Sequence, residues 1–81
     1  MRWNESYNIH MAKLGRGVFT LVVAWKGATE GGPGYRVTVA GLRAKAVYPN
    51  VEDGKAAALA LAERLAHEVL DEITNSREKH A

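Results

Sequence analysis

Residues 50–73 read NVEDGKAAALALAERLAHEVLDEI, and this stretch decides the fold. Asn50 is a favourable N-cap, and Asp53 three residues later resembles the reciprocal half of a capping box. Alanine and leucine, the strongest helix formers, dominate the residues that follow. At about 100° per residue the apolar side chains fill one half of a helix surface. They are Ala58, Leu59, Leu61, Ala62, Leu65, Ala66, Val69, Leu70 and Ile73.

The segment before this helix alternates with a period of two, which is typical of β-strands. Residues 18–26, 35–40 and 42–48 each show the alternation, and the third is the weakest. A glycine-rich loop over residues 27–34 and a tight connection at Gly41 join them. Short links between consecutive strands favour antiparallel pairing.

The N-terminal segment has two interpretations. Tyr7, Ile9 and Met11 alternate as in a strand, and residues 15–17 would form a hairpin turn into the next strand. However, Trp3, Tyr7, Met11 and Leu14 also follow helical spacing. We favour a strand over residues 7–13.

Together these patterns predict an α+β domain over residues 1–74: an antiparallel sheet of three or four strands with one long C-terminal helix packed across one face. Residues 75–81 have no apolar face, and we expect them to form a frayed tail. The covered face is expected to carry Phe19, Leu21, Val23, Trp25, Tyr35, Val37, Val39 and Tyr48. The open face is expected to carry Thr20, Arg36, Thr38, Arg43 and Lys45.

Composition narrows the class of protein. The chain has 81 residues, of which 47% are hydrophobic and 25% are charged, as in ordinary globular domains. It has no cysteine, which excludes disulfides and thiolate metal sites. The longest apolar run, residues 18–25, is too short to span a bilayer, and no secretory leader is evident at the N-terminus. We therefore expect a cytoplasmic domain with no membrane partner.

Charge is distributed unevenly along the chain. Seven basic and two acidic residues give residues 1–49 a net charge of +5, whereas four basic and seven acidic residues give residues 50–81 a net charge of −3. Such a split suggests two faces with different partners. The acidic candidate surface is the outer side of the helix, with Glu63, Glu68 and Asp71. The basic candidate surface is the open sheet face, with Arg36, Arg43 and Lys45.

No catalytic or metal-binding constellation stands out, and we expect neither a cofactor nor an enzyme activity. His67 has Glu63 and Asp71 four residues away on either side, but such a row is usually a solvated helix face. Residues 31–34 (Gly-Gly-Pro-Gly) lack the Gly-Lys-Ser/Thr ending of a phosphate-binding loop and lead into a strand rather than a helix.

Two stretches carry resemblances to known families. The segment Tyr35-Arg36-Val37-Thr38-Val39, followed by Gly54-Lys55-Ala56-Ala57-Ala58, is similar to double-stranded-RNA-binding domains, whose last helix opens with phosphate-contacting lysines. Here Glu52 and Asp53 stand at that point, and only Lys55 is basic. HicB-type antitoxins share the layout of three strands and a helix.

The start of the helix, Asn50-x-Glu52-Asp53-Gly54-Lys55-x-Ala57-Ala58, resembles that of small uncharacterised phage and prophage proteins. In those proteins an N-terminal Trp (here Trp3) and an Ala-Lys-Leu-Gly segment (here residues 12–15) precede two or three strands. Their size and layout are similar to those of several anti-CRISPR inhibitors. The resemblance implies a stoichiometric binder and assigns no residue a role.

The leading hypothesis is thus a non-enzymatic phage-type protein that binds or inhibits a host protein or nucleoprotein complex. The alternative is a nucleic-acid-binding domain that uses the basic sheet face. Dimerisation is a further expectation, because a chain this short builds only a small core.

Overall fold

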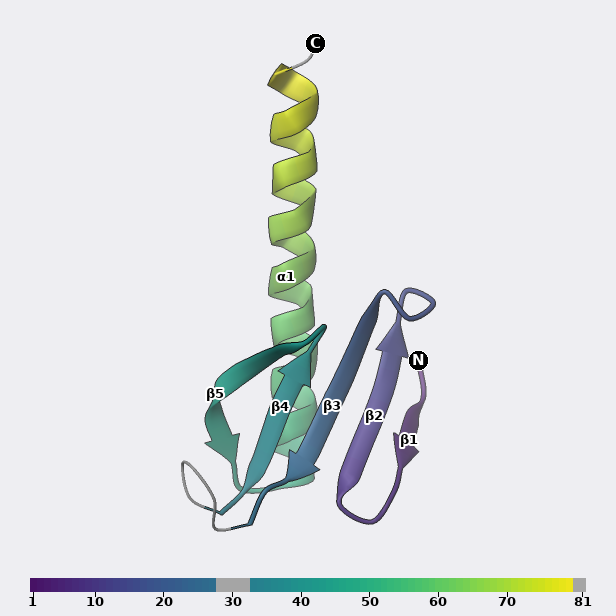
Figure 1. The fold of residues 1–81 in the computed structure, drawn as a ribbon, viewed down its shortest axis with the longest axis vertical. Helices are drawn as coiled ribbons and strands as arrows, with labels where there is room; N and C mark the ends of the chain where they lie inside the picture. Colours follow the sequence, from purple (N-terminus) through teal and green to yellow (C-terminus); the bar gives the residue numbers. More distant parts are fainter. Residues whose placement is uncertain (28–32, 80–81) are drawn as a thin grey trace.

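The computed structural model describes residues 1–27 and 33–79. Five strands form one antiparallel sheet in the order β1-β2-β3-β4-β5, and one helix follows them (Figure 1). The strands are β1 (Trp3–Glu5), β2 (Ile9–Leu14), β3 (Phe19–Trp25), β4 (Tyr35–Val39) and β5 (Leu42–Tyr48), and the helix is α1 (Val51–Lys79).

The predicted α+β class and the antiparallel sheet beneath a C-terminal helix are confirmed. The N-terminal segment is a strand, β2, rather than a helix. A further short strand, β1, which the sequence pattern did not indicate, pairs with β2 and makes the sheet five-stranded. Only three residues long, β1 is too short for a period-two pattern to emerge.

The helix extends further than predicted. Its N-terminus confirms the N-cap, because the backbone N–H of Asp53 donates to Asn50 Oδ1 at 2.8 Å. Asp53 Oδ2 accepts from the side-chain Nδ2 of Asn50 at 3.2 Å, whereas in a capping box it would accept from the backbone N–H. At the other end, residues 75–79 are helical, where the pattern predicted a frayed tail. Their polar side chains give no amphipathic signal, but they are also free of helix-breaking Gly and Pro.

The core lies between α1 and the central strands β3 and β4. Their alternating side chains meet the small residues of the helix, so the predicted covered face is confirmed except at Trp25. Trp25 stands at the end of β3 and is 40% exposed. The large, fully buried side chains of the sheet are Leu21, Val23, Val37 and Val39, and Ala58 and Ala62 face them from α1. Burying each of the larger side chains contributes about 1.5–3 kcal/mol to folding.

The glycine-rich loop predicted over residues 27–34 lies largely outside the described residues, which resume at Pro33. The β4–β5 connection is the two-residue turn of Ala40 and Gly41, with φ of 51° and 83°. Positive φ at both central residues is the geometry that joins twisted strands tightly.

Gly54 sets the distance between helix and sheet. It is buried in the first turn of α1, and a Cβ built there would lie 2.7 Å from Val23 Cγ1. No real Cβ tolerates that separation from a well-packed methyl group. The absence of a side chain at Gly54 allows the backbone of α1 to approach β3.

We predict that Gly54→Ala destabilises the fold by about 1–3 kcal/mol, although alanine is the better helix former, because the new methyl group overpacks against Val23. Urea unfolding measures the change. The added cost of Gly54→Ala should shrink in a Val23→Ala background, where the clashing methyl groups are absent. Equal costs in both backgrounds would contradict the packing explanation.

Candidate functional site

Two surfaces of the described residues carry charged or exposed apolar side chains that are not packed in the core: the open face of the sheet and the half of α1 that extends past the sheet. A polar cluster lies where α1 begins.

The open sheet face holds two of the predicted basic residues, Arg36 and Arg43, among apolar side chains. Cross-strand partners share a face, and the register aligns Met11, Val22, Thr38 and Arg43 in one row. A second row aligns Ile9, Ala24, Arg36 and Val47, and Lys13 lies opposite Thr20. Among these paired positions there is no acidic residue.

The basic residues differ in how accessible they are. Arg36 is only 9% exposed, because its stem lies at the centre of the sheet between Ala24 and Val47. Arg43 and Lys45 are exposed, and Lys45 lies where β5 departs from regular pairing with β4. The structure thus places the three predicted cations on neighbouring strands, with Arg36 largely buried.

The predicted acidic residues lie on α1, but they do not form one compact patch. Glu63, Glu68 and Asp71 are all exposed. At 3.6 residues per turn they spread over about 140° of the helix surface. Glu68 borders the groove between α1 and β5, while the other two lie farther around the helix. His67, between them in sequence, is also exposed.

The C-terminal half of α1 projects beyond the sheet. The helix has 29 residues and the longest strands have seven, which correspond to about 44 Å and 23 Å. Figure 1 shows α1 running behind the sheet and continuing far past its end. Leu65 is the last helix residue packed against the core. We name residues 66–79 the projecting segment.

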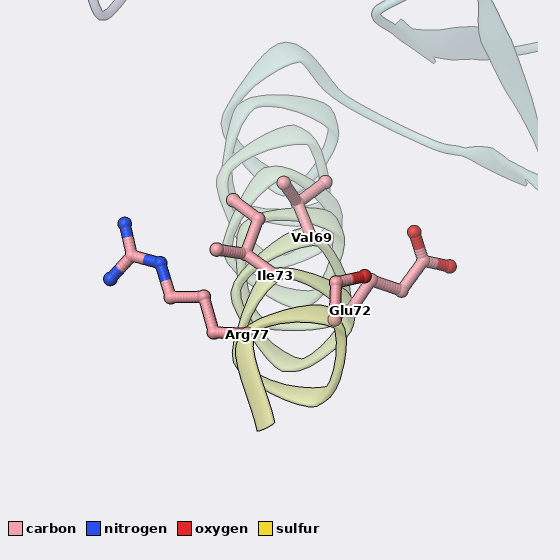
Figure 2. Close-up of a pocket in the computed structure, with 5 residues that line it drawn as sticks. Val69, Glu72, Ile73 and Arg77 are labelled. Atoms are coloured by element: carbon pink, nitrogen blue, oxygen red, sulfur yellow. The ribbon is translucent and has the colours of Figure 1, made fainter. Parts of the chain in front are cut away.

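The projecting segment exposes large apolar side chains. Val69 is 50% exposed, Leu70 58% and Ile73 45%. In Figure 2, Val69 and Ile73 lie together on one side of the helix, with the Glu72 and Arg77 side chains extending to either side of them. Periodicity predicted that these apolar residues belong to the packed half of the helix. The sheet ends before it reaches them.

A polar cluster at the start of α1 was not apparent in the sequence. The Lys55 ammonium donates a hydrogen bond to the Glu5 carboxylate of β1 and lies 5.1 Å from the centre of the Trp3 ring. His10 Nδ1 lies 3.2 Å from the same carboxylate oxygen but is buried without a well-aligned hydrogen bond. Glu5 and Lys55 are 50 residues apart, so no local pattern reveals this contact.

The cluster joins the edge of the sheet to the helix. The hydrogen bond from Lys55, and then the neighbouring His10, hold the pKa of Glu5 below its ordinary value of about 4.5. Both partners favour the ionised carboxylate. The side chain of Glu5 is nevertheless 48% exposed, so solvent screens the interaction and its contribution to stability is modest.

In comparisons with known proteins, the chain matches no protein-family model, no curated protein and no solved structure. Among the described residues there is no group of three or more His, Asp or Glu side chains placed to hold a metal ion. No helix over residues 1–27 and 33–79 is long and apolar enough to cross a membrane.

We predict that Glu5→Gln destabilises the fold near neutral pH and that the difference from wild type shrinks below about pH 4.5. A carboxyl whose pKa is lowered by folding stabilises the native state above its unfolded-state pKa, and this is lost as pH falls through the folded-state pKa. Urea unfolding at pH 7, 4.5 and 3 measures the difference. Glu63→Gln, which removes an exposed helix carboxylate, is the matched control, and a pH-independent difference for Glu5→Gln would contradict the prediction.

Proposed function

We propose that this protein is a non-enzymatic binding protein that docks the projecting segment of α1 onto another protein. The observation that carries the proposal is the exposure of Val69, Leu70 and Ile73 on helix that the sheet does not support. An isolated helix of this length is marginal in water. Packing against a partner would bury these side chains and stabilise the helix at the same time.

Charge favours a basic partner. The projecting segment contains Glu68, Asp71, Glu72 and Glu78 against Arg77 and Lys79, a net charge of −2. An apolar strip beside carboxylates is complementary to a groove lined by apolar and basic side chains. Host proteins that bind nucleic acid present such basic grooves. The proposed action is stoichiometric occupation of such a surface, on a host protein or a nucleoprotein complex.

The exposed strip supplies a direct test. We predict that Leu70→Gln combined with Ile73→Gln weakens partner binding at least tenfold, because the apolar contacts are lost. The fold should keep its stability within about 0.5 kcal/mol, because neither side chain packs in the core. Capture from host extract, quantified by mass spectrometry and followed by titration of the purified captured component, measures binding.

Two control variants sharpen this test. Leu59→Gln makes the same kind of change at a partly exposed leucine in the half of α1 that packs on the sheet, outside the projecting segment. This variant should leave partner binding intact. Simultaneous Glu63→Lys, Glu68→Lys and Asp71→Lys should abolish binding if the partner is basic. The proposal is wrong if the Leu70/Ile73 variant retains every component that wild type binds. If the sedimentation coefficient of the wild-type chain rises with its concentration, the partner is a second copy of the chain.

A second candidate function rests on the open sheet face, where Lys13, Arg36 and Arg43 occur without an acidic residue among the paired positions. Such a face would contact phosphates of a nucleic acid, without base stacking, because its exposed large residues are aliphatic.

If that second function holds, three or four phosphate contacts should reduce affinity for duplex DNA by roughly 40- to 150-fold between 50 and 200 mM salt. Fluorescence anisotropy with labelled single- and double-stranded oligonucleotides measures this. Arg43→Gln with Lys13→Gln should flatten the salt dependence. Absence of binding at 50 mM salt would exclude this function.

A further inference from the structure

A groove of about 770 Å³ runs between β5 and the sheet-packed half of α1. It is separate from the projecting segment except at Glu68, which borders both. Its walls come from one strand and one helix: Leu42, Arg43, Ala44, Lys45, Ala46 and Tyr48 from β5, and Ala57, Ala60, Leu61, Arg64, Leu65 and Glu68 from α1.

The strand wall of the groove is an edge of the sheet. β5 ends the strand order, and among the described residues only β4 pairs with it. Its outer backbone N–H and C=O groups therefore point away from the sheet. The pairing with β4 is irregular over the segment between Arg43 and Val47, and Figure 1 shows β5 curving away from β4 there. An unpaired edge beside a helix is the arrangement that accepts an added strand from another polypeptide.

The apolar part of the groove is lined by small residues. Four alanines, at positions 44, 46, 57 and 60, stand where larger side chains would fill the space. Leu61 and Leu65 close the apolar surface on the helix side, and Leu42 remains 54% exposed at one end. Such a surface leaves room for the larger apolar side chains of a bound segment.

The polar part of the groove is basic. Arg43, Lys45 and Arg64 oppose the single acid Glu68, a net charge of +2. None of these three cations belongs to the ion pairs found among the described residues, which join Glu5 to Lys55 and His10. An acidic occupant would supply the missing counter-charges.

We propose that this groove binds an extended polypeptide segment in which apolar and acidic residues alternate, as a sixth strand on β5. Successive side chains of a strand point to opposite faces. The apolar side chains of the bound segment would enter the alanine-lined space against α1. The acidic side chains would lie beside Arg43 and Lys45, so the alternation of the bound strand matches the apolar and the basic parts of the groove.

The experiment titrates the ¹⁵N-labelled full chain with the peptide acetyl-Val-Asp-Val-Asp-Val-Asp-amide. Chemical-shift changes should concentrate at the backbone amides of β5 and of residues 57–65, and outward-facing β5 amides should gain protection from hydrogen exchange. A matched peptide with lysine in place of aspartate should bind at least tenfold more weakly. Shifts elsewhere, or none at millimolar peptide, would overturn the proposal.

Charge-swapped variants test the specificity. Arg43→Glu with Lys45→Glu should reverse the preference, binding the lysine peptide at least tenfold more tightly than the aspartate peptide. Arg2→Glu with Arg16→Glu makes the same charge change at exposed positions away from the groove and should leave the preference unchanged. Unaltered spectra outside the groove establish that each variant is folded.

Other occupants give distinct results that refute the proposal. Tighter binding of oligo-dT than of the aspartate peptide to the same amides would identify a nucleic-acid site. Protection of β5 amides in a wild-type dimer without peptide would identify a second copy as the occupant. Because the Leu70/Ile73 variant leaves the groove intact, failure of the peptide experiment and failure of the projecting-segment proposal are separate observations.

Discussion

The close packing of α1 on β3 and β4 is the contact on which the rest of this structure depends. It exists because the helix presents small residues, Gly54, Ala58 and Ala62, to the branched side chains of the sheet. The backbones can therefore approach closely, and four large side chains of the described sheet are fully buried. The core is small, so each of its contacts is a large fraction of the stability.

The same contact determines which surfaces remain free. Since the core-facing side chains of α1 end at Leu65, the residues beyond it continue the apolar periodicity without a sheet to meet. Since α1 lies over β3, β4 and β5, the opposite face of the sheet stays open, with its cations and aliphatic side chains. The alanines toward β5 leave the groove beside the edge strand. Each free surface follows from where one helix ends and what size its side chains are.

The polar cluster stabilises the fold, whereas the free surfaces are available for binding. Glu5, His10 and Lys55 fasten a peripheral strand to the start of α1, and this role is structural. Over residues 1–27 and 33–79, no ion pair or side-chain hydrogen bond involves the projecting segment or the side chains that line the groove. Exposed apolar side chains beside an excess of one charge are typical of surfaces that bind other proteins, and this supports the proposal that the two surfaces are binding sites.

Local patterns in the sequence determined the element types, the antiparallel order and the residues that face the core, because period-two and period-3.6 alternation record which side of a strand or helix is buried. They also determined the N-cap at Asn50. Tertiary structure alone decided the strand β1, the contact between Glu5 and Lys55, and the buried position of Arg36, since each depends on residues that lie far apart in the sequence. It also decided that Val69, Leu70 and Ile73 are exposed. A helical repeat shows that one face of α1 is apolar, but only the length of the sheet determines at which residue that face stops packing and becomes exposed.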